Sequence, residues 1–171
     1  MHTEVGKVMT EHPLVQKFSF TGSTKVGKML MQQCASTVKK VSLELGGNAP
    51  LIVFDDADIN QAVKGAIASK YRNAGQTCVC ANRIYVQDNI YNAFIEQYKK
   101  AVSSLKVGEG TEPGVEIGPL IDEKAIEKIN RLVHDAVEKG AVHNCRRRQA
   151  LMQENYFISQ VLSKAAIRKW Q

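Results

Sequence analysis

The cysteine best suited to chemistry is Cys78, which stands in a polar loop over residues 73–80. A nucleophilic thiol needs access to its substrate and a lowered pKa, and Arg72, six residues earlier, brings positive charge nearby. A structural cysteine more typically lies inside an apolar run, so the sequence favours a reactive thiol here. Cys80 raises the question of a disulfide with Cys78, although a bridge between residues so close together would be strained and readily reduced.

A second candidate is the carboxylate of Glu44, which lies at the end of an apolar strand and precedes Leu45, Gly46 and Gly47. An acid at the C-terminal edge of a strand faces the crevice in which α/β proteins bind ligands. Burial there would raise the pKa of the Glu44 carboxyl, which suits a general base. The alternative is a solvated glutamate at a strand end.

A third candidate is the segment 20–28, which places a glycine turn between a strand and a helix. The N-terminus of such a helix attracts anions; Gly22 lets the backbone approach a phosphate, and the Ser23 hydroxyl can donate to it. One alternative is a plain glycine turn with Ser23 as the helix N-cap. Another is a P-loop, because the segment fits G-x-x-x-x-G-K, but Met29 stands where that loop needs a Mg²⁺-binding Ser or Thr.

Strands and helices alternate along the chain and would position these three segments. Asp58 and Asp122 are typical helix N-caps, and Gly140 stands just past the end of the last helix. This alternation indicates an α/β protein with a mostly parallel sheet, which the glycines at 46 and 47 divide. The apolar spacing predicts strands at 15–20, 41–45, 51–54 and 84–86, and helices from residue 25, from residue 58, at 91–102 and at 126–137.

Composition excludes several classes of protein. The 171 residues are 44% hydrophobic and 23% charged, as in ordinary globular domains and unlike disordered or collagen-like chains. No apolar run approaches the roughly 20 residues that a membrane-spanning helix needs. The first residues lack the pattern of a signal or transit peptide, so we expect an intracellular, cytoplasmic protein, or a mitochondrial one in a eukaryote. The cysteines form no C-x-x-C motif, and no histidine stands at metal-ligand spacing from Cys78 or Cys80, so we expect no metal.

The formal net charge of +6 is concentrated at one end of the chain. Residues from 142 onward hold six Lys or Arg and one Glu, a net charge of +5, which leaves +1 on residues 1–141. A nucleic-acid-binding domain carries its positive charge on the folded body. We therefore expect neither nucleic acid nor membrane as a partner.

Taken together, the three segments resemble the aldehyde dehydrogenase superfamily, and the longer strings around them are most similar to succinate-semialdehyde dehydrogenases. The match comprises the Phe-Thr-Gly-Ser turn that ends at Ser23, the Glu-Leu-Gly-Gly signature that begins at Glu44, and the Gly-Gln-Thr-Cys loop that ends at Cys78. The spacing of 34 residues between Glu44 and Cys78 also fits the family. The resemblance runs from about Glu4 to Ala141.

The resemblance implies a role for each matching residue. Cys78 would attack the aldehyde carbon, and Glu44 would activate the water that hydrolyses the resulting thioester. Arg72 is similar to the arginine with which this subfamily holds the distal carboxylate of its substrate, a charge-assisted pair. Cys80 is similar to the partner in a redox-switch disulfide. NAD or NADP would be the cofactor, bound by Gly22, Ser23, Gly27, Leu45 and Gly46.

The resemblance also implies an organisation for the chain. Residues 1–45 would be the last βα unit of an NAD(P)-binding domain, residues 46–141 the first half of an α/β catalytic domain, and residues 142–171 a divergent basic tail. Full-length relatives are homo-oligomeric and much longer. The expected function is oxidation of a small-molecule aldehyde, succinate semialdehyde, by a truncated chain that is inactive alone. The alternative is a non-catalytic remnant that docks on full-length subunits.

Overall fold

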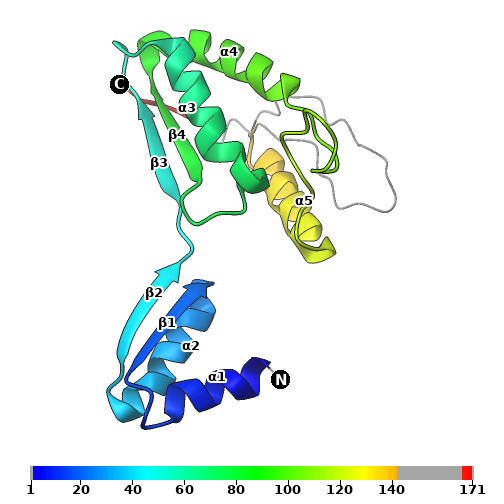
Figure 1. The fold of residues 1–171 in the computed structure, drawn as a ribbon. Coiled ribbons are helices and arrows are strands. Elements are labelled where there is room, and N and C mark those ends of the chain that lie inside the picture. Colours follow the sequence, from blue (N-terminus) through cyan, green and yellow to red (C-terminus); the bar gives the residue numbers. More distant parts are fainter. Residues whose placement is uncertain (1, 142–166, 171) are drawn as a thin grey trace. The chain divides into compact units, whose positions relative to one another are not determined.

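A computed structural model of the protein describes residues 2–141 and 167–170. The chain divides into two compact units, residues 1–47 and 48–171 (Figure 1). The residues of the basic tail from 142 to 166 lie outside the described part.

Unit 1 is a parallel pair of strands with helices. Its elements are α1 (His2–Glu11), β1 (Lys17–Gly22), α2 (Thr24–Cys34), a short 3₁₀ helix η1 (Ala35–Thr37) and β2 (Lys40–Leu45). The two strands pair in parallel, with Phe18 opposite Val41 and Gly22 opposite Leu45. Phe18, Leu30 and Cys34 form the buried core between the strands and α2. Cys34 is only 1% exposed, as a packing cysteine on the apolar face of a helix should be.

Unit 2 is a three-stranded parallel sheet with helices. Strand β4 lies in the centre, between β3 and β5. Residues of β3, β4, α3 and α4 form one core, in which Ala66, Val86 and Phe94 are fully buried. The elements are β3 (Ala49–Val53), α3 (Ile59–Tyr71), η2 (Arg72–Gly75), β4 (Ala81–Gln87), η3 (Asp88–Ile90), α4 (Tyr91–Ser104), α5 (Glu123–Glu138) and β5 (Ile167–Trp170).

Local sequence signals account for several helix boundaries. The side chains of Asp58 and Asp122 cap α3 and α5 by accepting from Gln61 N at 3.0 Å and from Ala125 N at 2.8 Å. Gly140, just past α5, has φ of +88°, which glycine adopts without strain. The predicted caps are therefore confirmed, as is the parallel α/β arrangement.

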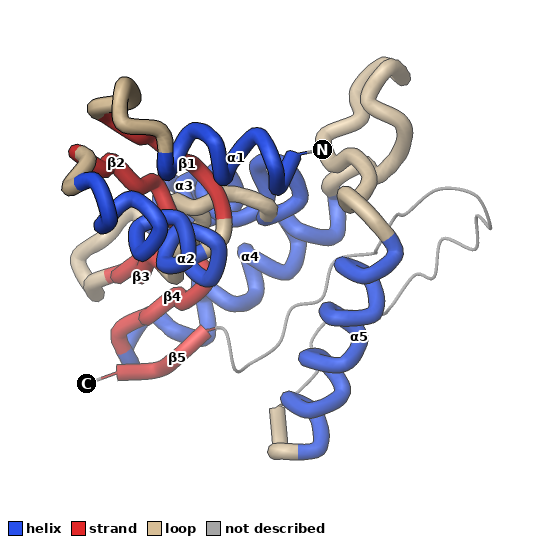
Figure 2. The backbone as a smooth tube through the Cα atoms, turned by 90° about the horizontal axis from the view of Figure 1, so that it is seen from below, coloured by secondary structure: helices blue, strands red, loops and turns tan. Residues whose placement is uncertain are grey.

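Besides the short 3₁₀ helices η1, η2 and η3, one α-helix and one strand were not predicted. Among the side chains of helix α1 that the structure describes, residues 4–11, no apolar stripe is buried: Val5, Val8 and Met9 are about half exposed, and Thr10 is the one buried residue. Strand β5 belongs to the segment that was set apart as a basic tail, and it pairs with β4 on the side opposite β3. No helix among the described residues is long and apolar enough to cross a membrane (Figure 2 shows the helices as blue tubes).

Candidate active site

The loop that carries Cys78 begins with an abrupt reversal of the backbone. Helix α3 ends at Tyr71, and Asn73, Ala74 and Gly75 then have φ of +51°, +55° and +80°. This left-handed conformation costs a residue such as alanine roughly 1–2 kcal/mol. Strain of this kind persists only where surrounding contacts enforce it, and it is often found at functional sites.

Hydrogen bonds from Gln76 and Thr77 hold the loop after the reversal. The Gln76 side chain donates to the backbone oxygen of Asn73 at 3.1 Å and accepts from the backbone nitrogen of Ile121 at 3.0 Å. The Thr77 hydroxyl lies 2.7 Å from the sulfur of Cys80. The loop is thus bonded both to itself and to the connection that precedes α5.

The two cysteines of this loop lie in opposite surroundings. Cys80 is 1% exposed, and its thiol donates to the backbone oxygen of Arg72 at 3.9 Å. Cys78 is exposed, as is its neighbour Val79, at 62%. Both cysteines are free thiols. Arg72 is also exposed, at the start of the loop. The arrangement presents one accessible thiol with a guanidinium on the same loop.

Glu44 does not have the burial that one of its two sequence alternatives requires. It belongs to unit 1, where it is exposed and lies opposite Thr21 on the neighbouring strand. Side chains alternate along a strand, so the residues that face α2, such as Val41, leave Glu44 on the other face. The helix covers one face only, and this is why Glu44 stays in solvent. Of the two alternatives that the sequence leaves open, the solvated glutamate at a strand end is the one found in unit 1.

The glycine turn and the end of β2 lie side by side at the carboxyl edge of the two strands. Gly22 pairs with Leu45, and Ser23 caps α2 by accepting from Val26 N at 3.3 Å. The alternative in which Ser23 is an N-cap is therefore what the structure has. The Ser23 hydroxyl proton remains available to donate, so the cap does not conflict with phosphate binding.

Two glycines of this segment differ in what surrounds them. Gly27 is buried, and a Cβ there would lie 2.6 Å from Leu45 Cδ2, so its small size lets α2 approach β2 closely. A Cβ on Gly46, by contrast, would meet no described atom within 4 Å. The packing role of Gly27 was not foreseen, and its role in cofactor binding stays a prediction.

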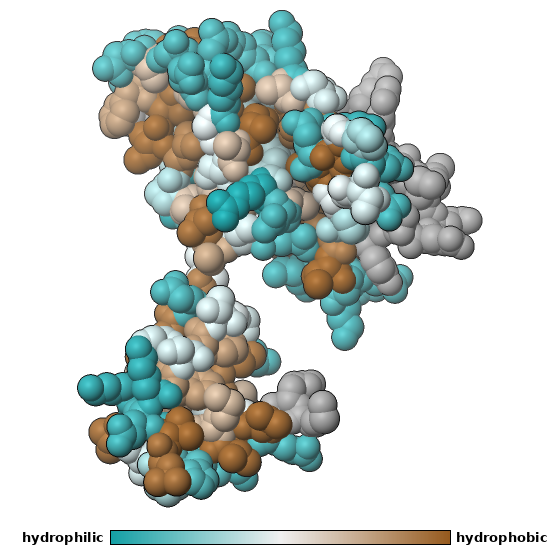
Figure 3. Space-filling view, in the orientation of Figure 1, coloured by the Kyte–Doolittle hydropathy of each residue, from teal (hydrophilic) through white to brown (hydrophobic). Residues whose placement is uncertain are grey.

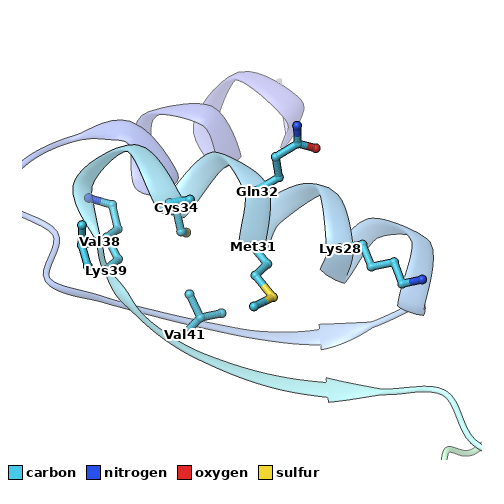
Figure 4. A pocket seen from close by; sticks show the side chains of 8 residues that line it. Lys28, Met31, Gln32, Cys34, Val38, Lys39 and Val41 are labelled. Carbon is cyan, nitrogen blue, oxygen red and sulfur yellow. The ribbon is translucent and has the colours of Figure 1, made fainter.

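Unit 1 also has an apolar hollow of about 500 Å³ between α2, η1 and β2. Met31 and Val41 point into it from α2 and β2 (Figure 4). At its rim, Lys39 is 8% exposed, and its ammonium donates to the backbone oxygens of His12 and Val15 at 2.6 and 2.8 Å. These bonds give Lys39 a structural role, and we assign no reaction to the hollow.

The structure thus brings some of the predicted site residues together. Arg72, Cys78 and Cys80 share one loop in unit 2, and the turn at Gly22 lies beside Leu45 in unit 1. Sequence reasoning missed the supporting roles of the Gln76 and Thr77 side chains. Gln76 and Thr77 are part of the motif itself, but their bonding partners could not be read from it. Among the described residues, no three His, Cys, Asp or Glu side chains gather as a metal site.

Comparison with known protein families shows to which family the chain belongs. A model described as the aldehyde dehydrogenase family matches residues 1–166. The chain belongs to this family. The match extends at both ends beyond residues 4–141, to which the sequence analysis confined the resemblance, and it includes most of the basic tail. Membership gives no support to the P-loop alternative.

Several relatives act on semialdehydes, to judge from their names. Succinate-semialdehyde dehydrogenase [NADP(+)] of Escherichia coli is 58% identical over 92% of this chain and 33% of its own length. The 3-sulfolactaldehyde dehydrogenase of Pseudomonas putida is 66% identical, over 81% of this chain and 29% of that protein. Glutarate-semialdehyde dehydrogenase of Pseudomonas aeruginosa is 61% identical, with the same coverage. The chain thus spans about a third of the length of the curated relatives it matches.

Solved structures confirm the predicted α/β fold. Succinate-semialdehyde dehydrogenase from Burkholderia pseudomallei superposes with a TM-score of 0.93 at 46% identity, over 98% of this chain and 38% of that chain. An NADP-dependent enzyme from E. coli gives a TM-score of 0.92 at 49% identity, with the same coverage. A betaine aldehyde dehydrogenase from Staphylococcus aureus, solved with NAD⁺, is 34% identical with a TM-score of 0.87, over 95% of this chain and 33% of that chain.

Proposed function

We propose that the chain carries the nucleophile and general-base segments of an NAD(P)-dependent aldehyde dehydrogenase, with succinate semialdehyde as its substrate. The observation that supports this most strongly is the accessible thiol of Cys78, held at the end of a strained and internally bonded loop in a member of the family. The proposed cofactor-binding turn and base belong to unit 1, and the proposed nucleophile belongs to unit 2.

The substrate class rests on Arg72 and on the names of the relatives. Succinate semialdehyde, glutarate semialdehyde and 3-sulfolactaldehyde are all aldehydes that carry an acid group. An exposed guanidinium six residues before the nucleophile suits such a group, because arginine can bind a carboxylate or sulfonate through paired, charge-assisted hydrogen bonds. An aldehyde without an acid group would gain nothing from Arg72.

The proposed reaction uses the sulfur of Cys78 and the carboxylate of Glu44 in turn. The Cys78 thiolate adds to the aldehyde carbon and forms a hemithioacetal. The nicotinamide of NAD or NADP, when bound, would supply the oxidation as the hydride acceptor. The thioester that remains on Cys78 is attacked by water, from which Glu44 takes a proton. The carboxylic acid product departs and Cys78 regains its thiol.

The cofactor would lie at the carboxyl edge of β1 and β2. The residues there fit an anionic group: the N-terminus of α2 and the Ser23 hydroxyl both favour a phosphate, and the space around Gly46 is open. Gly22, Ser23, Gly27, Leu45 and Gly46 are the residues that we propose for binding NAD or NADP.

A second candidate function is a non-catalytic partner of full-length subunits. Within the described part of the chain, strands β1 and β2 form a sheet of two, so each has one edge without a strand beside it. Unpaired edges of this kind invite another chain to add a strand. This candidate predicts co-purification with a full-length relative and no dependence on Cys78.

Arg72→Ala tests the proposed substrate class in a chimera. Residues 1–141 replace the corresponding part of a full-length relative, such as the E. coli enzyme at 58% identity. We expect kcat/KM for succinate semialdehyde to fall by about tenfold to a thousandfold, because a bound carboxylate loses its charged partner, while kcat/KM for butanal changes little. Lys64→Ala, an exposed cation on α3, is the control. Equal losses for both aldehydes would refute the role of Arg72 in binding the acid group.

A further inference from the structure

Lys70 occupies an unusual position beside the candidate active-site loop. It lies in the last turn of α3, half-buried, and its ammonium donates to Asn82 Oδ1 at 2.7 Å. The ammonium is also 3.9 Å from the place that a Cβ on Gly75 would occupy. Burial lowers the pKa of Lys70, and the neighbouring Cys80 acts in the opposite direction. A flexible, strongly hydrated side chain is held here at a cost in solvation, which calls for a specific role.

The hydrogen bond from Lys70 fixes the orientation of the Asn82 amide, and this amide in turn donates to Asn48. Lysine can only donate, so the carbonyl oxygen of the Asn82 amide must face Lys70 and its NH₂ group must point away. That group donates to Asn48 Oδ1 at 2.9 Å. The backbone oxygen of Asn48 accepts in addition from two nitrogens of Arg83, at 3.1 and 2.7 Å. Lys70, Asn82 and Asn48 thus link α3, β4 and the residue that precedes β3.

This network lies at the point where the Cys78 loop leaves and rejoins the body of unit 2. The chain departs from α3 just after Lys70 and returns at Ala81, whose backbone nitrogen donates to Ser69 Oγ at 3.3 Å. Cys80 is at this base and is buried, whereas Cys78 is farther out and exposed. The two thiols are only two residues apart, and yet only one of the two is accessible.

We propose that Lys70 is a positioning residue of the candidate active site. By orienting the Asn82 amide toward Asn48, it keeps the base of the 72–80 loop closed, so that Cys80 stays buried and Cys78 alone is presented for reaction. The catalytic meaning of this closure rests on the proposed role of Cys78 as nucleophile. The closure itself does not, and it can be measured without aldehyde or cofactor.

The test measures how fast iodoacetamide alkylates each cysteine of the full 171-residue chain, mapped by mass spectrometry. For Lys70→Met we expect Cys80 to be alkylated about tenfold faster or more, through local opening of the loop, with little change at Cys78. Lys70→Arg should restore the protection of Cys80, because arginine also donates. Lys64→Met removes an exposed charge from the same helix and should leave Cys80 protected.

A pair of asparagine variants tests whether Asn82 links Lys70 to Asn48. In Asn48→Asp the carboxylate can still accept from Asn82, so Cys80 should stay protected. In Asn82→Leu the side chain can neither accept from Lys70 nor donate to Asn48, so Cys80 should be exposed as in Lys70→Met. Equal alkylation of Cys80 in these two variants would overturn the proposed role of Asn82.

General loss of stability is separated from loop opening by Val63→Ala, which removes packing from the core of the same unit. The proposal requires that, for an equal decrease in unfolding temperature, Lys70→Met increases the alkylation rate of Cys80 more than Val63→Ala does. If both variants expose Cys80 equally, Lys70 is a merely structural residue and the proposal is wrong. A failure of Cys78 to support catalysis would leave these labelling results unaffected, so the two proposals fail separately.

Discussion

At the scale of single residues, the two cysteines of the candidate active-site loop, Cys78 and Cys80, differ most clearly in their surroundings. The Thr77 hydroxyl and the backbone oxygen of Arg72 lie against the sulfur of Cys80, whereas Cys78 is exposed. The reactive form of a cysteine is its thiolate, which must be both formed and reached. The difference in exposure alone therefore predicts that Cys78 reacts faster than Cys80.

The first prediction concerns thiol reactivity in the unmodified chain. At neutral pH we expect iodoacetamide to alkylate Cys78 about tenfold faster or more than Cys34, because Cys34 is 1% exposed in the core of unit 1. Mass-spectrometric mapping of the time course measures both rates in one sample. Equal rates would mean that the loop does not present Cys78 as described.

The motif residues of the site could be predicted from the sequence, whereas the contacts that hold them in place could not. Cys78 and Arg72 stand in strings typical of the family, and local sequence suffices to find them. The partner of Gln76, the backbone of Ile121, lies 45 residues away, and contacts of this range depend on the tertiary fold. The exposure of Glu44 was left open, because the sequence alone does not tell which face of a strand a helix will cover.

At the scale of elements, apolar spacing and capping residues predicted the sequence of strands and helices well. Asp58, Asp122 and Gly140 mark their helix ends through local chemistry. Helix α1 was missed because it lacks a buried apolar stripe. The left-handed turn at Asn73 and Ala74 was also missed, since neither residue requires it, and only the contacts around the loop enforce it. Helix α5 presents Leu132 and Val137 at 52% and 45% exposure, so its apolar spacing did not translate into burial.

A pair of glycine substitutions tests the description of α3 and its end. Gly75→Ala should lower the free energy of unfolding by about 1–2 kcal/mol, because alanine is strained at φ of +80° and its Cβ would lie 3.3 Å from Lys70 O. Gly65→Ala lies inside the helix, with nothing within 4 Å of the added Cβ among the described residues. It should raise the free energy of unfolding by up to about 1 kcal/mol.

Urea denaturation followed by circular dichroism measures both variants against the unmodified chain. The opposite signs are the informative result, since the two substitutions add the same methyl group at positions ten residues apart. Stabilisation by Gly75→Ala would show that the turn after α3 does not have the left-handed backbone.

At the scale of the whole molecule, the chain matches only part of each relative. It spans about a third of their length, and its surface includes large apolar residues such as Leu14, Val38 and Ile121, each more than 80% exposed. Figure 3 shows hydrophobic residues on the visible face of each unit. Exposed apolar groups and unpaired strand edges both favour association with further protein.

The isolated chain is therefore expected to oxidise no aldehyde at a measurable rate. Most of the length of its relatives has no counterpart in it, and losing a single donor to the transition state already costs about 10²–10³ in rate. The measurement is the rise in absorbance of NADH or NADPH on addition of succinate semialdehyde to the purified chain. Steady production of reduced cofactor would contradict this expectation and show that the chain suffices for catalysis.

The central claim, that Cys78 is the nucleophile of an aldehyde-oxidising site, is tested most directly in the chimera with a full-length relative. We measure kcat for succinate semialdehyde oxidation with Cys78 intact, with Cys78→Ser, and with Cys34→Ala as the matched control. The account predicts that Cys78→Ser lowers kcat by about a thousandfold or more, because the hydroxyl is a far weaker nucleophile than the thiolate, while Cys34→Ala keeps kcat close to that of the unmodified chimera. A Cys78→Ser chimera that retains more than about a tenth of the original kcat would contradict the account.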